Sequence, residues 1–157
     1  MASLCVIPLV YVALQKEKPN AKNLAVSAVV KTIESGKASF DVTIKNNDEM
    51  PFTYVVYEGA KGMPSRDIQA EVQTGDLTRQ SLNKGWDPLP NPIPADQIFI
   101  GNVENDRLNT ETVNQVTTGN AVSTTVTVEG LPKGVLSKVT FIVNKSARSA
   151  PVDVQVP

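Results

Sequence analysis

The sequence predicts an all-β fold, built as an antiparallel sandwich. Its 22 valines and 13 threonines far outnumber its ten leucines, and β-branched residues favour strands over helices. Several segments alternate apolar with polar residues, which is the pattern of a strand that buries one face. Turn sequences rich in Gly, Pro and Asn separate these segments at the short spacing typical of sandwiches. A length of 157 residues suits one domain with an appendage.

Three strands are predicted in the first part of the domain, over residues 24–33, 38–45 and 52–57. The first two are joined by a hairpin turn at 34–37. The second strand alternates apolar and polar side chains, so one of its faces should be buried. The apolar positions on that face are Phe40, Val42 and Ile44. A polar turn follows at 46–49, and Pro51 begins the third strand.

One short helix is predicted next. Ser65, directly after Pro64, has the position of a helix N-cap, and Gly75 is placed to end the helix. Ile68 and Val72 lie four residues apart, which is the spacing of one helix face. This face should pack on the sheet.

A proline-rich insertion occupies residues 83–96 and contains the only tryptophan, Trp86. Prolines at alternate positions over 88–94 favour an extended, polyproline-like segment and exclude a central strand. Residues 98–103 are predicted as an edge strand. Three more strands are predicted in the last third of the chain, over residues 122–128, 139–143 and 152–156.

Two runs of the sequence resemble a fibronectin type III or related immunoglobulin-like module of bacterial or phage surface proteins. The first, TTVTVEGLPKGVLSKVTFIVNKSARSAP over 124–151, has a Gly-Leu-x-x-Gly turn followed by a Val-x-Phe-x-Val strand. The second, YVVYEGAKGMPSRDIQAEVQTG over 54–75, looks like the strand, proline, short helix and glycine of such modules. The resemblance implies an Ig-like sandwich over 24–157 with insertions, and no particular activity.

An uncharged, apolar arm is predicted at 1–15, followed by a polar hinge at 16–23. Read as a strand, the arm is apolar on both faces. Leu4, Val6, Val10, Val12 and Leu14 lie on one face, and Cys5, Ile7, Leu9 and Tyr11 on the other. Such a segment must be covered on both sides. An arm bound by another subunit is favoured over a strand of its own domain and over a cleaved or membrane-directed segment.

Composition excludes several classes of function. A net charge of −1 provides no field to attract nucleic acid or an anionic membrane. The chain has no histidine, which excludes histidine-based catalysis and histidine-ligated metals. Its single cysteine excludes an internal disulfide and a cysteine-only metal cage. We therefore expect a protein that is not an enzyme and holds no cofactor or metal. The arm at 1–15 is also too short for a membrane-spanning helix.

Individual residues add few candidate sites. Asp67 and Glu71 share one face of the predicted helix, but paired carboxylates need a cleft for acid–base chemistry. Three oxygen-bearing side chains that could bind Ca²⁺ lack the usual alternating pattern: Asn102, Asn105 and Asp106. Trp86 could stack on a sugar ring or a partner surface, or it could close the end of the core. Cys5 is favoured as a small buried apolar residue over a partner in an intersubunit disulfide.

The predicted function is that of a non-enzymatic structural subunit. The arm of one copy would add a strand to a neighbouring copy, which gives a homo-oligomer or polymer, either an extracellular filament or a virion-surface array. The predicted location is an extracellular appendage or a virion surface, and assembly inside the cell without a cleaved signal is consistent with it. The alternative is a secreted adhesion or carbohydrate-binding module that uses Trp86 and the proline-rich loop.

Overall fold

A computed structural model describes the chain over residues 20–58, 67–83, 88–101 and 110–157. Within these ranges the protein has eleven strands and no helix, which confirms the predicted all-β class. The strands are β1 (Leu24–Glu34), β2 (Lys37–Asn46), β3 (Phe52–Glu58), β4 (Ile68–Thr74), β5 (Leu77–Asn83), β6 (Ile98–Ile100), β7 (Thr110–Val116), β8 (Ala121–Glu129), β9 (Ser137–Val143), β10 (Ala147–Arg148) and β11 (Val152–Val154).

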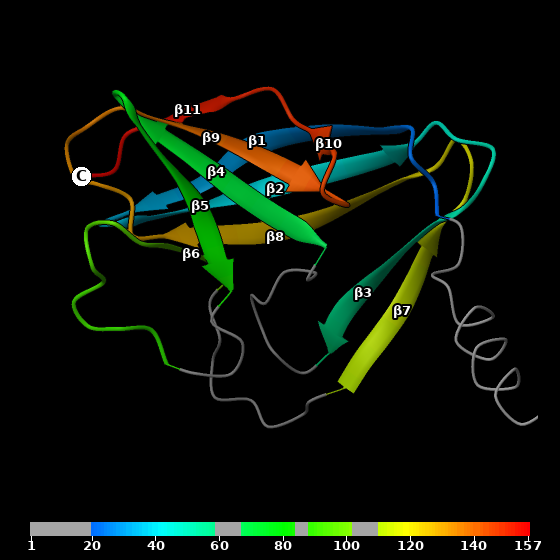
Figure 1. Ribbon diagram of the computed structural model, residues 1–157, viewed down its shortest axis with the longest axis horizontal. Coiled ribbons are helices and arrows are strands. Elements are labelled where there is room, and N and C mark those ends of the chain that lie inside the picture. Colours follow the sequence, from blue (N-terminus) through cyan, green and yellow to red (C-terminus); the bar gives the residue numbers. More distant parts are fainter. Residues whose placement is uncertain (1–19, 59–66, 84–87, 102–109) are drawn as a thin grey trace, which may run out of the picture.

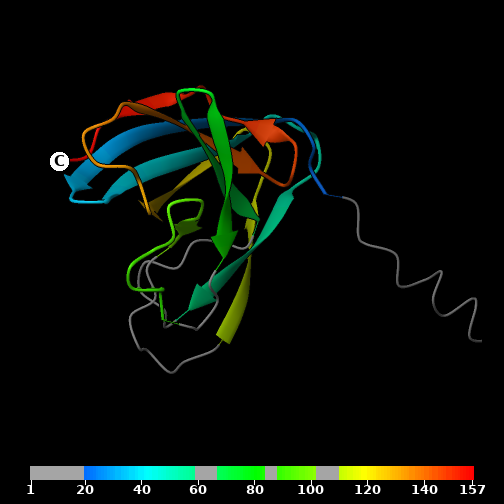
Figure 2. The same cartoon turned by 60° about the vertical axis from the view of Figure 1, so that its left-hand side comes forward.

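Nine strands form one strongly curved sheet, while β3 and β7 form a separate ribbon that extends away from it in two views (Figure 1, Figure 2). The order in the sheet is β1–β2–β8–β6–β5–β4–β9–β10, and β11 pairs with β9. The sheet curls until β1 comes close to β9, β10 and β11, so that it is nearly a barrel. Within the described chain no ladder joins β1 to these three strands. We call this line of approach the seam.

The predicted first hairpin is confirmed. β1 and β2 pair antiparallel from Leu24 opposite Asn46 to Glu34 opposite Lys37. Gly36 in the turn has a φ of 76°, a left-handed conformation that glycine adopts without strain. The predicted inner face of β2 is fully buried at Phe40, Val42 and Ile44.

The core lies inside the curved sheet. Its largest fully buried side chains come from several strands and include Phe40, Phe52, Phe141, Ile44, Ile98, Val72, Val126 and Val139. Phe40 of β2 and Phe141 of β9 meet edge to face, with ring centroids 5.1 Å apart. Because β2 and β9 lie far apart in the strand order, this contact joins opposite walls of the sheet.

The predicted helix near residues 64–75 is wrong over its described part, which is strand β4. Ile68, Ala70 and Val72 are all buried, and this spacing of two is the period of a strand. The spacing of four between Ile68 and Val72 fits the period of a helix and that of a strand. The segment forms a strand because it pairs with β5 and β9. Gly75, with a φ of 58°, lies in the β4–β5 turn and ends no helix. Pro64 and Ser65 lie outside the described residues.

The edge strand predicted at 98–103 is also corrected. β6 covers only Ile98–Ile100, and residues from 102 lie outside the described ranges. β6 is internal, because it pairs parallel with β5 and antiparallel with β8. Neighbours on both sides complete its hydrogen-bond ladders, and all three residues are buried. β5 and β7 were not predicted, since their sequences LTRQSLN and TETVNQV alternate only weakly.

The strands predicted in the last third are present. β8 and β9 match the predicted segments, and the final strand is shorter, with Val156 forming an isolated bridge to Lys133. Asn144 and Lys145 connect β9 to β10 with φ values of 52° and 64°. Two successive positive φ values are the geometry of a type I′ turn, which suits the twist of a hairpin.

Candidate functional site

The residues that the sequence marks most strongly lie outside the described ranges. This holds for the arm, for Trp86 and for the three residues considered for Ca²⁺. They are Leu4, Cys5, Val6, Ile7, Leu9, Val10, Tyr11, Val12, Leu14, Trp86, Asn102, Asn105 and Asp106. Their roles stay predictions. The described chain includes the attachment point of the arm, the edge strand beside the seam, and a cleft next to the proline-rich segment.

The attachment point is fixed to the domain by Asn20 and Ala21. The Asn20 side chain pairs with the backbone of Thr53: its Oδ1 accepts from the N–H at 2.7 Å and its Nδ2 donates to the carbonyl at 2.9 Å. Ala21 is fully buried, and its N–H donates to the carbonyl of Pro51 at 3.3 Å. The domain therefore holds the chain from Asn20 onward, within the last part of the predicted hinge.

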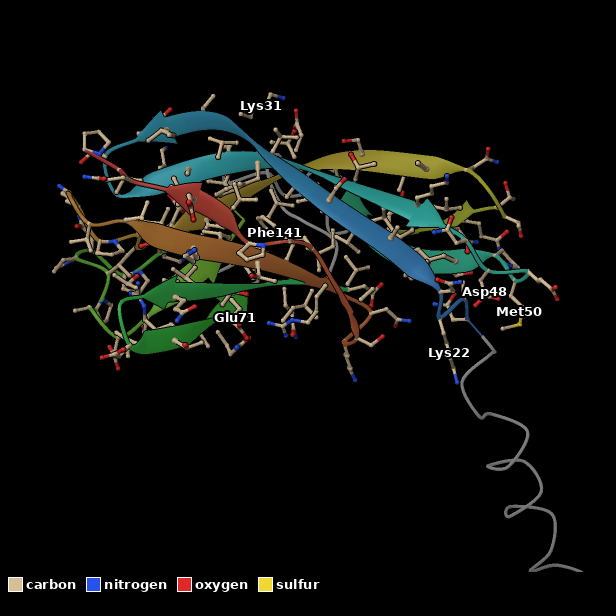
Figure 3. The ribbon with its side chains drawn as sticks, turned by 90° about the horizontal axis from the view of Figure 1, so that it is seen from above. Lys22, Lys31, Asp48, Met50, Glu71 and Phe141 are labelled. Atoms are coloured by element: carbon tan, nitrogen blue, oxygen red, sulfur yellow. The ribbon has the colours of Figure 1, made fainter. Side chains whose placement is uncertain are left out.

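Asp48 also binds the hinge, just before the start of β1 (Figure 3). Its Oδ2 accepts the N–H groups of Lys22 at 2.8 Å and Asn23 at 3.1 Å, and its Oδ1 accepts that of Met50 at 3.4 Å. These three donors, Lys22 first, hold the pKa of the Asp48 carboxyl below its usual value. The polar turn that the sequence predicts at 46–49 thus fixes the last residues of the hinge, Lys22 and Asn23.

β1 is the edge strand at the seam (Figure 3). Its ladder with β2 is regular from Leu24 to Val30 and shifts register before Thr32. Four apolar side chains on its inner face are only partly buried against the core: Leu24, Val26, Ala28 and Val30. On its outer face Val29 is 65% exposed. An edge strand presents backbone N–H and C=O groups to which another strand can add.

A cleft of about 600 Å³ lies between the proline-rich segment and the turns that follow β1 and β8. Its apolar walls are formed by Leu89, Pro90, Ile93, Pro94, Leu131 and Pro132. Gly130 allows these segments to pack closely, because a Cβ there would lie 2.7 Å from the Gln97 carbonyl oxygen. Its φ of 93° also requires glycine.

Arg79 of β5 is the charged group placed most deeply in this cleft, with only 7% of its surface exposed. Its Nη1 donates to the carbonyls of Ala95 at 3.0 Å and Gly130 at 3.5 Å. Its Nε and Nη2 are buried without a hydrogen-bond partner. Burial lowers the pKa of the guanidinium. Sequence reasoning missed Arg79, because a lone arginine in a polar strand carries no signal of its environment.

Asp67, which the sequence places with Glu71 on one helix face, precedes β4, and Glu71 lies within that strand. Asp67 and Glu71 do not share a helix face, because Ile68–Thr74 is a strand. Glu71 instead pairs with Arg148 at 2.8 Å and accepts from Gln80 at 2.7 Å, which ties β4 to β10 and β5. Across the described ranges, no three His, Cys, Asp or Glu residues gather where a metal could bind, and no helix is long and apolar enough to cross a membrane.

Comparison with known proteins gives no assignment. No protein-family model matches the sequence, and no curated protein matches it. The function is therefore inferred from the predicted arm, the attachment point at Asn20 and Ala21, and the edge strand β1.

Proposed function

We propose that the protein is a non-enzymatic structural subunit that self-assembles when the N-terminal arm of one copy adds to edge strand β1 of another. The observation that carries the proposal is the position of β1, which pairs with β2 alone among the described strands. The proposed product is a filament or a virion-surface array, because a contact between two different surfaces of one chain propagates unless it closes into a ring.

The seam suits the arm better than the outer face of the sheet does. The outer face of β2 and β8 is polar and linked side chain to side chain, with Ser39 and Thr127 2.9 Å apart. Asp41 and Thr125 continue this polar surface, at 2.9 Å. An apolar arm gains little by covering such groups. The seam instead offers partly buried apolar side chains beside unpaired backbone.

The lengths of the two segments agree. The regular part of β1, Leu24–Val30, has seven residues and spans about 24 Å at the rise of an antiparallel strand. The apolar residues of the arm, 4–14, outnumber these positions and leave the hinge to connect the two copies. Because β1 already lies close to β9, β10 and β11, we expect the arm to widen the seam as it pairs.

The proposal keeps the Ig-like character of the domain and a location outside the cell or on a virion. Its support is the sequence resemblance over 124–151. The predicted arm supports assembly, because a segment that is apolar on both faces must be covered on both faces.

Deletion of residues 2–15 tests the proposal, because it removes the arm and keeps Asn20 and Ala21, which hold the attachment point. Sedimentation velocity should show oligomers for the full chain and a monomer for the shortened chain. Val29→Glu on β1 should also weaken assembly by placing a charge beside the added strand. Leu77→Glu is the matched control, since Leu77 is 54% exposed and lies on β5, which is not one of the strands that meet at the seam.

Three results would contradict the proposal. One is a monomeric full chain at high concentration. Another is an oligomer that survives the deletion unchanged. The third is equal weakening by Val29→Glu and Leu77→Glu, which would point to a general effect of charge on solubility. Both glutamate variants should fold, because the replaced side chains are exposed.

A further inference from the structure

We infer that the arm, once bound, also pairs with β10 and β11, so that it becomes the strand that closes the curved sheet into a barrel. This second pairing rests on the proposed function, which places the arm of another copy against β1. It adds a partner on the far side of the seam, where β10 and β11 lie. The strand that enters the seam is the apolar segment 4–14 of the second copy.

The core is least covered along the seam. Across the described chain, seven apolar side chains are only partly buried against the core, and six of them belong to strands that border the seam. These six are Leu24, Val26, Ala28 and Val30 on β1, Ala147 on β10 and Val152 on β11. The seventh, Val122, lies at the start of β8, which does not border the seam. A strand inserted in the seam would therefore cover apolar surface on both sides of it.

The width of the seam suits one added strand. Paired strands lie about 4.8 Å apart, so two strands with a third between them lie about 9.6 Å apart. Cα atoms of β1 come within 8 Å of Cα atoms in β10 and β11, although no ladder joins these strands in the described chain. A small opening of the seam is therefore enough to admit one strand and no more.

The far side of the seam offers backbone for pairing and no charge that opposes an apolar strand. Among the described strands, β10 and β11 each pair with β9 alone, so their other edges are available to a new strand. Their charged side chains are engaged with neighbouring strands. Arg148 pairs with Glu71 at 2.8 Å, and Asp153 pairs with Lys138 at 3.7 Å. The uncharged arm therefore meets mainly Ala147 and Val152 on this side.

Hydrogen–deuterium exchange on the full chain tests the inference, with the chain lacking residues 2–15 as the reference. We expect amides on both sides of the seam, over 24–30 and 147–154, to exchange at least about tenfold more slowly in the full chain, because new ladders protect them. Amides of the β4–β5 turn, at 74–77, should change by less than about twofold and serve as the internal control. Sedimentation velocity on the same samples reports whether the copies assemble.

The exchange pattern separates this inference from the proposed function. Slower exchange over 24–30 alone, in copies that assemble, overturns the second pairing and leaves the proposed function intact. Slower exchange on both sides of the seam in a monomeric chain would place the arm in its own copy, which overturns both. Unchanged exchange on both sides also overturns both.

A matched pair of variants then locates the contact on the far side. Val152→Ser removes apolar surface beside the seam and should raise the concentration needed for assembly by about fivefold. Val122→Ser is the control, because Val122 is also partly buried against the core but lies away from the seam, and it should change this concentration by less than about twofold. Equal effects overturn the inference. The exchange comparison needs no substitution on the far side, so it decides the matter even if Val152→Ser fails to fold.

Discussion

At the scale of single residues, a few polar side chains connect the described end of the hinge, the sheet and the β3–β7 ribbon. Asn46 is fully buried, and its Nδ2 donates to the carbonyls of Met50 and Val116, each at 2.8 Å. Its Oδ1 accepts from the Asp48 N–H at 2.8 Å. Buried polar groups stabilise a fold only when they are satisfied, and Asn46 meets that condition. Asn20 and Asp48 extend the network to the described end of the hinge, residues 20–23.

Asp48 gives the fold a defined response to acid. Its folded pKa is lowered by the N–H groups of Lys22, Asn23 and Met50, so its contribution to stability is present above the unfolded pKa of about 3.9. It is lost as the pH falls through the lower folded pKa. Asp48→Asn cannot make this contribution, so the difference in melting temperature between wild type and variant should shrink below about pH 4.

Thermal unfolding of both proteins from pH 7 downward measures this difference. Asp76→Asn, in the exposed β4–β5 turn, serves as the control for a carboxylate without these donors. A difference for Asp48→Asn that stays constant into strong acid would show that the carboxylate charge does not stabilise the attachment point.

At the scale of elements, strands that strictly alternate apolar and polar residues could be predicted from the sequence. Strands whose formation depends on pairing with neighbouring strands could not be predicted. β2 and β8 alternate so regularly that their buried faces follow from the pattern, whereas their pairing with each other does not. Residues 68–74 have apolar positions that fit a helix and a strand alike. Pairing with β5 and β9 makes this segment a strand. β6 has only three residues, and its central position depends on β5, whose own sequence alternates weakly.

The β9–β10 turn carries strain that a single substitution should relieve. Lys145 has a φ of 64°, and a side chain in this left-handed region costs about 1 kcal/mol or more. Lys145→Gly creates the Asn-Gly pair preferred in type I′ turns, so it should raise the free energy of unfolding by up to about 1 kcal/mol. Lys145→Ala, which removes the same charge but keeps the Cβ, should give no gain. Chemical denaturation measures both, and equal effects would contradict this account of the turn.

At the scale of the whole molecule, the sequence alone predicts the arm as an assembly element but does not indicate where it binds. The arm is recognised by its missing charges, which are a local property of the chain. The seam arises from the curvature of the whole sheet, which brings β1 near β9–β11 without pairing. The cleft depends on Arg79, Ala95 and Gly130, which are distant in sequence. Such long-range arrangements leave no local periodicity to read.

The most direct test of arm exchange uses the only cysteine of the chain, Cys5 in the arm, as one half of a disulfide. A tagged second copy carries Cys5→Ser together with a new cysteine on the outer face of β1, at Ala25, Ser27 or Val29 in turn. A disulfide requires Cα atoms within about 7 Å, so its formation reports close contact. The control copy carries Cys5→Ser and Leu77→Cys.

Mixed copies are oxidised mildly and separated on a non-reducing gel. The proposal predicts a mixed disulfide between the unaltered chain and at least one β1 variant, in clear excess over the Leu77→Cys control. Equal yields from β1 and control positions would contradict it. A second contradicting result is a disulfide within a single chain that carries both Cys5 and Val29→Cys, with no mixed disulfide formed between copies.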